Sequence, residues 1–423
     1  MEINTSIIKN KHPNIEWEIA VSEAITESVE IDNRELGTPV SASTKAVIIR
    51  VILADNRTGI SIESNPENYM AVFENALKTA KATPPNNTRA DISPRITHSA
   101  DNKTFSNFNE DELFSSAEIM RSELDNKAPL LNLNVSKMIS KAQYYNSNGS
   151  DIKVEEDNIS AQIQIGKNHR LGTAVTSLRL KKPDFKALVR EAMEYYNYSK
   201  KLAKIKSGEY DVLFCHDALM TVMQPIIFSL TGDTVFEKKS QYAGKLNEKV
   251  LSNKIILADN PLHKNNHSSF DCEGYKTNKT TVINKGVIKT FLHDSYTSKA
   301  LNALNTHNSS SIMAKPSVSF FNPEIIGTTP FKKMLAETGK GVIVYDLYPE
   351  HTVNNVTGAF GLNSSRFYYV KNGEIAGLVN GGVVTGNSYE IFKKVDSVSR
   401  ETKYDTGNYN FPVIKTKAQI LTQ

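Results

Sequence analysis

Apolar residues in the first part of the chain form strand-like runs followed by a helical stripe. The runs at residues 15–21, 47–54 and 59–63 predict three strands. Pro66 then begins a predicted helix, and Asn65 before it is a favourable cap. The apolar side chains of this helix share one face, at Tyr69, Val72, Phe73, Ala76, Leu77 and Ala80.

A similar strand and helix recur further along the chain. Residues 172–180 predict a strand, and Pro183 begins a helix whose apolar positions have the same spacing as the first. Each unit contains an Arg-x-Gly turn, at residues 57–59 and 170–172. The recurrence predicts an internal duplication of a strand–strand–helix unit; the alternative is that two amphipathic helices share a common pattern. The second stripe consists of Phe185, Leu188, Val189, Ala192, Met193 and Tyr196.

The segment between the two units begins with a polar stretch. Residues 83–109 predict a long loop or a poorly ordered linker, because prolines and asparagines cluster near its start. We predict helices at residues 110–123 and 135–143. A hairpin turn is predicted at residues 146–149, since the Asn-Gly pair there readily adopts positive φ.

Short strands and short helices are mixed from residue 208 onward. Residues 284–286 and 372–373 lie between apolar runs and predict hairpin turns. Pro330 begins a predicted helix, which Gly339 ends. Because strands and helices do not alternate regularly, we predict an α+β fold with mixed, mostly antiparallel sheets and flanking helices.

The length of 423 residues is sufficient for two domains. We place an N-terminal α+β domain at residues 1–207, with the polar linker at 83–109, and a C-terminal domain at residues 208–423. The 50 basic and 46 acidic residues leave a net charge of +4. The basic clusters are short, which argues against direct nucleic-acid binding.

Cysteine usage and hydropathy indicate the compartment. Two cysteines are too few for a disulfide framework and indicate a reducing environment. The first residues lack the apolar core of a signal peptide, and no run approaches the roughly 18 apolar residues of a membrane span. We therefore expect a cytoplasmic protein without a membrane partner.

Cys215, His216 and Asp217 form a cluster with the residue types of a nucleophilic site. Adjacent side chains on a strand point to opposite faces, so the cysteine and the histidine do not readily meet. We expect Cys215 to be a small buried apolar residue, and His216 or Asp217 to begin a helix.

Two further groups of residues could bind a metal or transfer protons. His263 and His267 have the spacing of a metal-binding pair on a helix, but the residues between them predict a polar loop. Asp271 and Glu273 would share one face of a strand, and paired carboxylates can act as acid and base. We favour a turn-stabilising role for this pair. Asp294 is expected to help cap a helix that begins at the next residue.

The second half of the chain contains several short motifs, of which the first is Phe-Asp-Cys-Glu-Gly at residues 270–274. It is similar to the Asp-x-Glu-Gly element of the TldD/PmbA family of metallopeptidases, whose motifs this chain resembles in order and spacing. Residues 284–296 resemble its Gly-Val-Leu…Leu-x-Asp-x-Tyr stretch, and residues 316–322 stand where it has a short Pro-Ser…Asn strand. The matching motif residues are Asp271, Glu273, Gly274, Gly358, Phe360 and Asn387.

The resemblance also identifies a missing metal site. In the zinc-bearing branch of that family a helix carries His-Glu-x-x-x-His, and a gapless alignment places Met223, Gln224 and Phe228 at these three positions. A thioether, an amide and a phenyl ring supply neither the usual zinc ligands nor the base. That branch also has a cysteine ligand near its C-terminus, whereas this chain has no cysteine after Cys272. The resemblance therefore implies the PmbA/TldE-like branch, with no metal and no catalytic residue in this chain.

The function implied by the resemblance is that of a subunit in a TldD/TldE-type metallopeptidase. Such an enzyme would degrade or mature small or unfolded peptides, with zinc in a TldD-like partner. This chain would supply peptide-binding and dimer surface. Residues 316–322 predict an exposed sheet edge for an extended peptide, with Ser317, Ser319 and Asn322 as candidate contacts.

Two alternatives remain open. One is a non-enzymatic homodimer that binds and modulates another protein, because the PmbA name is associated with DNA gyrase. The other is an autonomous hydrolase that uses Asp271, Cys272 or Glu273.

Overall fold

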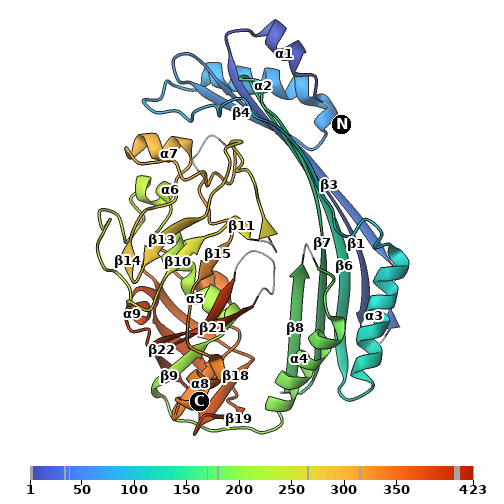
Figure 1. The fold of residues 1–423 in the computed structure, drawn as a ribbon, viewed down its shortest axis with the longest axis vertical. Helices are drawn as coiled ribbons and strands as arrows, with labels where there is room; N and C mark the ends of the chain where they lie inside the picture. The colour runs from blue at the N-terminus through green and yellow to red at the C-terminus, as the bar shows by residue number, and fades with distance from the viewer. Residues whose placement is uncertain are drawn as a thin grey trace.

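The computed structural model of the chain has two parts that face each other (Figure 1). A long twisted sheet from the N-terminal half runs along one side of the molecule, and the C-terminal half lies opposite it. The structure describes residues 3–32, 35–37, 39–168, 170–178, 181–263, 266–313, 317–403 and 410–422.

The N-terminal sheet is mostly antiparallel, in the order β4-β3-β1-β6-β7-β5. The short β2 pairs with β1, and β8 pairs with β7. The exception to the antiparallel pattern is β5, which runs parallel to β7. The strands are β1 (Glu16–Asp32), β2 (Glu35–Leu36), β3 (Val40–Ile52), β4 (Thr58–Glu63), β5 (Thr97–Asn102), β6 (Leu130–Asn146), β7 (Asp151–Lys167) and β8 (Arg170–Leu178).

One face of this sheet is covered by helices at both ends. Trp17 and Ile19 of β1 join the apolar core beneath α2, while Val29 and Ile31 join the core beneath α3 and α4. Side chains alternate along a strand, so the even-numbered residues of β1 face the C-terminal half. The helices are α1 (Thr5–Lys11), η1 (Pro66–Asn68), α2 (Tyr69–Ala82), α3 (Glu110–Leu124) and α4 (Phe185–Tyr198).

The element order of the N-terminal half occurs twice. The series β1-β3-β4-α2 is repeated by β6-β7-β8-α4, and β1 pairs with β6 where the two units meet. A side chain at Gly59 would place its Cβ 2.1 Å from the carbonyl oxygen of Ala76, and one at Gly172 would lie 2.0 Å from that of Ala192. Each glycine therefore allows its strand to touch the helix that follows, as the predicted duplication requires.

The C-terminal half contains a large mixed sheet in the order β17-β20-β22-β9-β16-β18-β19, with β21 paired to β22. Within it β9 and β16 are parallel, and the other pairs are antiparallel. These strands are β9 (Gly208–Phe214), β16 (Lys340–Val344), β17 (Ala359–Asn363), β18 (Phe367–Lys371), β19 (Glu374–Leu378), β20 (Val383–Asn387), β21 (Ser397–Lys403) and β22 (Phe411–Leu421).

A smaller sheet, a short hairpin and six helical segments complete the described part of this half. The small sheet has the order β14-β13-β10-β15, and β11 pairs with β12. Their bounds are β10 (Leu257–Asp259), β11 (Leu262–His263), β12 (Asn266–His267), β13 (Thr280–Asn284), β14 (Val287–Ile288) and β15 (Pro323–Ile325). The helices are α5 (His216–Phe228), α6 (Gly232–Phe236), α7 (Ser295–Ala300), α8 (Phe331–Ala336), η2 (Glu350–Thr352) and α9 (Ser388–Lys393).

The α+β class with mostly antiparallel sheets is confirmed. The hairpins predicted at residues 284–286 and 372–373 join β13 to β14 and β18 to β19. The structure divides its sheets between β8 and β9, and the predicted domain boundary at residues 207 and 208 stays a prediction. Residues 179–180 of a predicted strand and residue 316 of the predicted sheet edge lie outside the described residues. No helix of the described chain combines the length and apolar character needed to cross a membrane.

The predicted helix at residues 135–143 is wrong, because this segment is the middle of β6. Its apolar positions have a spacing that also suits a helix. Strand β6 pairs with β1 on one side and β7 on the other along most of its length. Hydrogen bonds to two neighbouring strands therefore outweigh the local pattern.

The polar linker predicted at residues 83–109 is also wrong in part. It contains β5, which adds to the edge of the sheet beside β7. Phe105 and Phe108 are buried in the core with α3. The buried carboxylate of Asp157 accepts hydrogen bonds from the backbone N–H groups of Thr104 and Phe105, at 2.8 Å each. Polar composition did not indicate these long-range partners.

Candidate functional site

Helix α5 contains the three positions that correspond to the zinc-binding motif of the zinc-bearing branch and that lack its residues in this chain. Met223 is fully buried in the main apolar core, and Gln224 and Phe228 are half-buried. Pro225 lies inside the same helix. A core thioether, an amide and a phenyl ring do not fit zinc, whose usual protein ligands are thiolate, imidazole and carboxylate. Within the described ranges, no three His, Cys, Asp or Glu side chains are grouped so that they could hold a metal ion.

The Cys215 cluster at the start of α5 does not form a nucleophilic triad. Cys215 is buried among apolar residues, as expected. The Nδ1 atom of His216 lies 2.8 Å from the carbonyl oxygen of Phe411, and burial lowers the pKa of this histidine. Asp217 accepts a hydrogen bond from Arg366 at 3.1 Å. The histidine and the aspartate are therefore directed toward other groups.

His263 and His267 lie on the two strands of the short β11–β12 hairpin. In this register His263 is opposite Asn266, and His267 is opposite Leu262. A spacing of four residues brings two histidines together only on a helix. These two histidines lie on a hairpin instead and do not share one face. Residues 264 and 265 between the strands lie outside the described residues.

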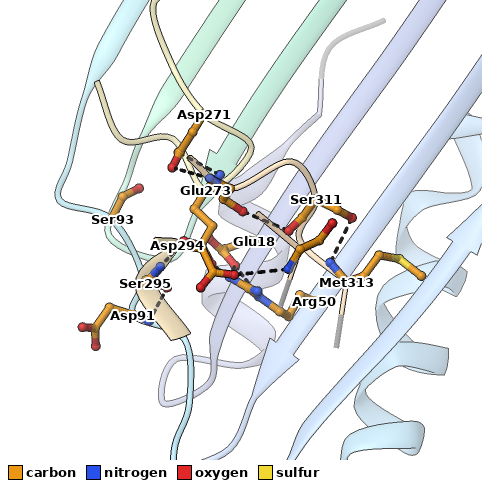
Figure 2. Close-up of polar contacts among 12 residues, drawn as sticks. Glu18, Arg50, Asp91, Ser93, Asp271, Glu273, Asp294, Ser295, Ser311 and Met313 are labelled. Atoms are coloured by element: carbon orange, nitrogen blue, oxygen red, sulfur yellow. Dashed lines mark hydrogen bonds and ion pairs between the residues drawn. The ribbon is translucent and has the colours of Figure 1, made fainter. Parts of the chain in front are cut away.

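A group of buried charges joins the two halves of the molecule (Figure 2). Arg50 of β3 donates to Glu18 of β1 from Nε at 2.6 Å and to Glu273 of the C-terminal half from Nη2 at 3.0 Å. All three side chains are at most 5% exposed. We call Glu18, Arg50 and Glu273 the ion cluster. It links residues that are far apart in the chain.

Neighbouring polar groups complete the hydrogen bonding of the ion cluster. Tyr144 of β6 donates its hydroxyl to Glu18 at 2.6 Å. The backbone N–H of Ser295, at the start of α7, donates to Glu273 at 3.0 Å. The Ser295 hydroxyl accepts a hydrogen bond from the backbone of Asp91 at 3.0 Å, so the segment before β5 also reaches this site.

The electrostatics of the ion cluster follow from two carboxylates sharing one guanidinium. Burial raises the pKa of Glu18, and raises that of Glu273 to about 7, although Arg50 opposes both shifts. Burial alone would lower the pKa of Arg50, but the two carboxylates raise it above its ordinary value. Because the three groups are enclosed, we interpret the cluster as a structural connection between the halves.

Asp271 stabilises the turn that carries Glu273. Its Oδ1 accepts hydrogen bonds from the backbone N–H groups of Glu273 and Tyr275, at 3.0 and 2.9 Å, and its Oδ2 accepts one from Ser309 at 3.3 Å. Burial raises the pKa of this carboxyl well above its ordinary value, with a further contribution from Glu273. The turn-stabilising role predicted for Asp271 is confirmed, whereas Glu273 has the additional role of binding Arg50.

The thiol of Cys272, between these two residues, is unsuited to nucleophilic attack. Cys272 is exposed at the wall of a cavity, where desolvation by the surrounding atoms raises the pKa of its thiol to about 12, and the carboxyls of Asp271 and Glu273 contribute to the shift. At neutral pH the thiol is therefore protonated, and the thiolate is the reactive form.

The remaining motif residues support local structure. Asp294 caps α7, where its Oδ1 accepts a hydrogen bond from the backbone of Thr297 at 2.7 Å. Asn387 donates to the carbonyl of Thr357 at 2.7 Å and accepts from the backbone of Tyr389 at 3.0 Å. Next to this contact, Gly358 packs against the Tyr389 ring, and Phe360 joins the main apolar core.

The predicted substrate-binding segment is not a regular strand. In its described part, Val318 makes one isolated bridge. Asn322 is buried, and its side chain donates to the carbonyl of Asn260 at 2.9 Å. The expected exposed sheet edge is therefore wrong, and Asn322 stabilises a neighbouring loop. Substrate contacts by Ser317 and Ser319, which are half-buried, stay a prediction.

The sequence interpretation missed the N-terminal members of this site. Glu18 and Arg50 each lie inside a run that predicted a strand with a buried face. A charged residue on a buried strand face requires a partner, and that was the available signal. The identity of the partner, Glu273, could not be inferred from local sequence.

Family models match both halves of the chain. Residues 207–421 match the PmbA/TldA metallopeptidase C-terminal domain, and residues 17–82 match the PmbA/TldA metallopeptidase domain 1. The chain belongs to this family. The motifs that the sequence analysis identified in the C-terminal half therefore lie within the matched family domain.

Similar proteins occur in archaea and bacteria. The chain is 28% identical over 275 residues to a metalloprotease of Archaeoglobus fulgidus, covering 63% of this chain and 64% of that protein. It is 26% identical over 329 residues to an uncharacterized protein of Methanocaldococcus jannaschii, covering 75% of this chain and 76% of that protein.

Two solved structures share the fold of this PmbA/TldD-family chain. A proposed modulator of a DNA gyrase from Thermotoga maritima aligns with a TM-score of 0.84 and 23% identity, covering 98% of this chain and 97% of that chain. TldE from Thermococcus kodakarensis aligns with a TM-score of 0.83 and 22% identity, covering 96% of each chain. At these identities the likeness establishes the fold alone.

Proposed function

We propose that this chain is a TldE/PmbA-like subunit of a TldD/TldE-type metallopeptidase and does not itself catalyse hydrolysis. The observation that carries the proposal is the chemistry of helix α5. Met223 is enclosed in the apolar core, and Gln224 and Phe228 lack the donor atoms of a zinc site. Zinc and the water that it activates would come from a TldD-like partner.

The role of the chain in such an assembly is to hold an unfolded or small peptide and to contribute dimer surface. The long N-terminal sheet and the opposing C-terminal half present two surfaces to one another (Figure 1). Ser317 and Ser319 remain candidate peptide contacts. We place the assembly in the cytoplasm, without a nucleic acid or a membrane as a direct partner.

Purification of the full chain alone and with a TldD-like chain from the same genome tests this proposal. We expect the isolated chain to contain no stoichiometric zinc and to cleave no unfolded peptide. We expect the mixture to form a heteromeric complex by size measurement and to cleave peptide in a chelator-sensitive reaction. The TldD-like chain alone is the control for cleavage that does not depend on this subunit.

The opposite results would contradict the proposal. Stoichiometric zinc in the isolated chain, or chelator-sensitive cleavage by that chain alone, would overturn the non-catalytic role. A stable homodimer that does not bind the TldD-like chain would favour the alternative of a binding protein or modulator, in keeping with the description of the Thermotoga maritima protein.

A further inference from the structure

A cavity of about 360 Å³ lies between the inner face of the N-terminal sheet and two segments of the C-terminal half. The sheet contributes residues of β1, β3, β6 and β7. The other wall comes from residues 268–274, which include the Asp-x-Glu-Gly element, and from residues 310–312. The cavity therefore exists only where the two halves meet. Its volume is within the range of about 300–1,000 Å³ that is typical of small-ligand sites.

The hollow on the sheet side arises from small residues set among large ones. Ala20 of β1 is paired with Ile48 on one side and with Tyr144 on the other. Ala142 of β6 is paired with Val154 of β7. Side chains at these paired positions share one face of the sheet, so Ala20 leaves space between its two bulkier partners, and the small pair Ser22 and Ala142 extends this space toward Val154. Phe270 and Ile312 close the opposite side.

The chemistry of the lining is apolar with a hydroxyl-bearing rim. The carboxylate of Asp271, which also borders the cavity, already accepts three backbone hydrogen bonds. Ser269 and Ser310 provide neutral hydroxyl groups at the border. No lysine or arginine is among the lining residues, so an anionic group would find no partner; the acidic members of the lining are Asp271 and Glu156 of β7. The rest of the lining is neutral and mostly apolar, and the cavity is therefore matched to apolar groups.

The sheet face beyond the cavity favours a peptide as the molecule that carries these groups. Ala24 and Thr26 continue the inner face of β1, and their partners across β3 are Thr44 and Ala42. The outer face of the same strand carries Glu23 and Glu27 instead. An extended peptide could thus follow the uncharged inner faces of β1 and β3 into the cavity, where Glu156 of β7 lies at the border.

We propose that this cavity is a subsite for apolar side chains, of the size of leucine or phenylalanine, in an unfolded peptide. The proposal rests on the proposed function and adds the class of side chain that the subunit selects. Cys272 provides a natural probe, because it lines the cavity and is solvent-accessible, whereas Cys215 is buried in the C-terminal core.

Binding of fluorescent peptides to the full chain, measured by anisotropy, tests the subsite. The peptides share one unstructured sequence and differ at one position, which is Leu, Phe or Asn. Burying one such side chain should make the Leu and Phe peptides bind about 10- to 100-fold more tightly than the Asn peptide. Ala142→Phe fills the hollow and should remove this preference. Ser43→Phe, a similar change on the outer face of β3, should leave the preference unchanged.

Two further measurements guard against a variant that fails to fold. Ile48→Ala enlarges the half-buried wall of the cavity and should shift the preference toward a peptide with Trp at the variable position. In the unmodified chain, a saturating Leu peptide should slow the reaction of Cys272 with a small mercurial reagent, and the Asn peptide at the same concentration should not. Cys272→Ser identifies the signal that belongs to this thiol.

The outcomes separate the subsite from the proposed function. If the chain binds all peptides equally and a folded Ala142→Phe variant behaves like the unmodified protein, the subsite is wrong while peptide binding stands. If free acetyl-leucine amide protects Cys272 as well as the Leu peptide does at equal concentration, the cavity is a site for small apolar molecules and the peptide assignment fails. If no peptide binds, the peptide-holding role fails as well.

Discussion

At residue 274 the chain has no room for a side chain. Gly274 has φ of +77°, and a Cβ there would lie 2.4 Å from a ring carbon of Tyr144, across the boundary between the two halves. Tyr144 also donates its hydroxyl to Glu18 of the ion cluster. The glycine of the Asp-x-Glu-Gly element is therefore needed for close approach of the N-terminal sheet as well as for its backbone conformation.

Replacement of Gly274 should separate the effect of backbone strain from the effect of close approach to Tyr144. Gly244 has the same φ of +77°, but nothing lies within 4 Å of a Cβ placed there. We expect Gly244→Ala to lower the free energy of unfolding by about 1 kcal/mol through backbone strain alone. Gly274→Ala should cost about 2–4 kcal/mol, because overpacking against Tyr144 is added. Urea unfolding of the two variants measures the difference, and equal losses would contradict the role of close approach.

At the scale of elements, α7 connects the C-terminal half to the ion cluster. Asp294 and Thr297 form a capping box at its start, with the Asp294 side chain accepting from the Thr297 backbone and the Thr297 side chain accepting from the Asp294 backbone. The next residue, Ser295, donates its backbone N–H to Glu273 and its hydroxyl accepts from Asp91. The cap therefore orients a helix terminus that supports the contact between the halves.

Removal of the cap should destabilise the protein, and a residue that caps equally well should not. We expect Asp294→Ala to lower the free energy of unfolding by about 1–2 kcal/mol, because the first backbone N–H groups of α7 lose their acceptor. Asp294→Asn should cost no more than about 0.5 kcal/mol, since asparagine is an equally good cap and only the long 3.3 Å hydrogen bond from the backbone of Ser317 to Oδ2 is lost. Thermal unfolding of both variants tests this, and a larger loss for the asparagine variant would show that the charge matters more than the cap.

Elements defined by short-range signals were predicted well, and elements defined by pairing were not. Helix α3 and the cap of η1 by Asn65 agree with the expectation, because caps and amphipathic stripes involve residues close in sequence. Strand β1 was expected at residues 15–21 but continues to Asp32. Its second part lacks a clear apolar run, and its length depends on pairing with β3 and β6.

At the scale of the whole molecule, the ion cluster makes the contact between the halves sensitive to pH. The pKa of Glu273 is raised to about 7 from an ordinary value of 4.5, chiefly by burial. A carboxyl whose pKa is raised in the folded state binds more protons there than in the unfolded state. The resulting contribution to stability is present below pH 4.5 and is lost as the pH rises through about 7.

The pH dependence of unfolding should therefore change when Glu273 can no longer ionise. We expect the free energy of unfolding to fall from pH 5 to pH 8, with Glu273 contributing on the order of 2–3 kcal/mol. Glu273→Gln should show a shallower fall, because glutamine stays neutral.

The single tryptophan, Trp17, is buried next to Glu18 and provides the fluorescence signal. Asp259→Asn is the matched control: the pKa of Asp259 is raised to about 6 at a site away from Arg50, so this variant should flatten the fall below about pH 6 and leave the fall between pH 6 and 7 unchanged. Identical pH slopes for Glu273→Gln and the unmodified protein would contradict this assignment.

The sequence by itself determined the fold class, the helical stripes, the hairpin turns and the family motifs, together with the absence of zinc-type donors at residues 223, 224 and 228. These features depend on residues close together in the chain or on side-chain chemistry alone. Only the tertiary structure decided that residues 135–143 are a strand, that Asn322 is buried, and that Glu18, Arg50 and Glu273 meet. Glu273 is 223 positions from Arg50. Contacts over such separations depend on how sheets pair and pack, which local propensity does not specify.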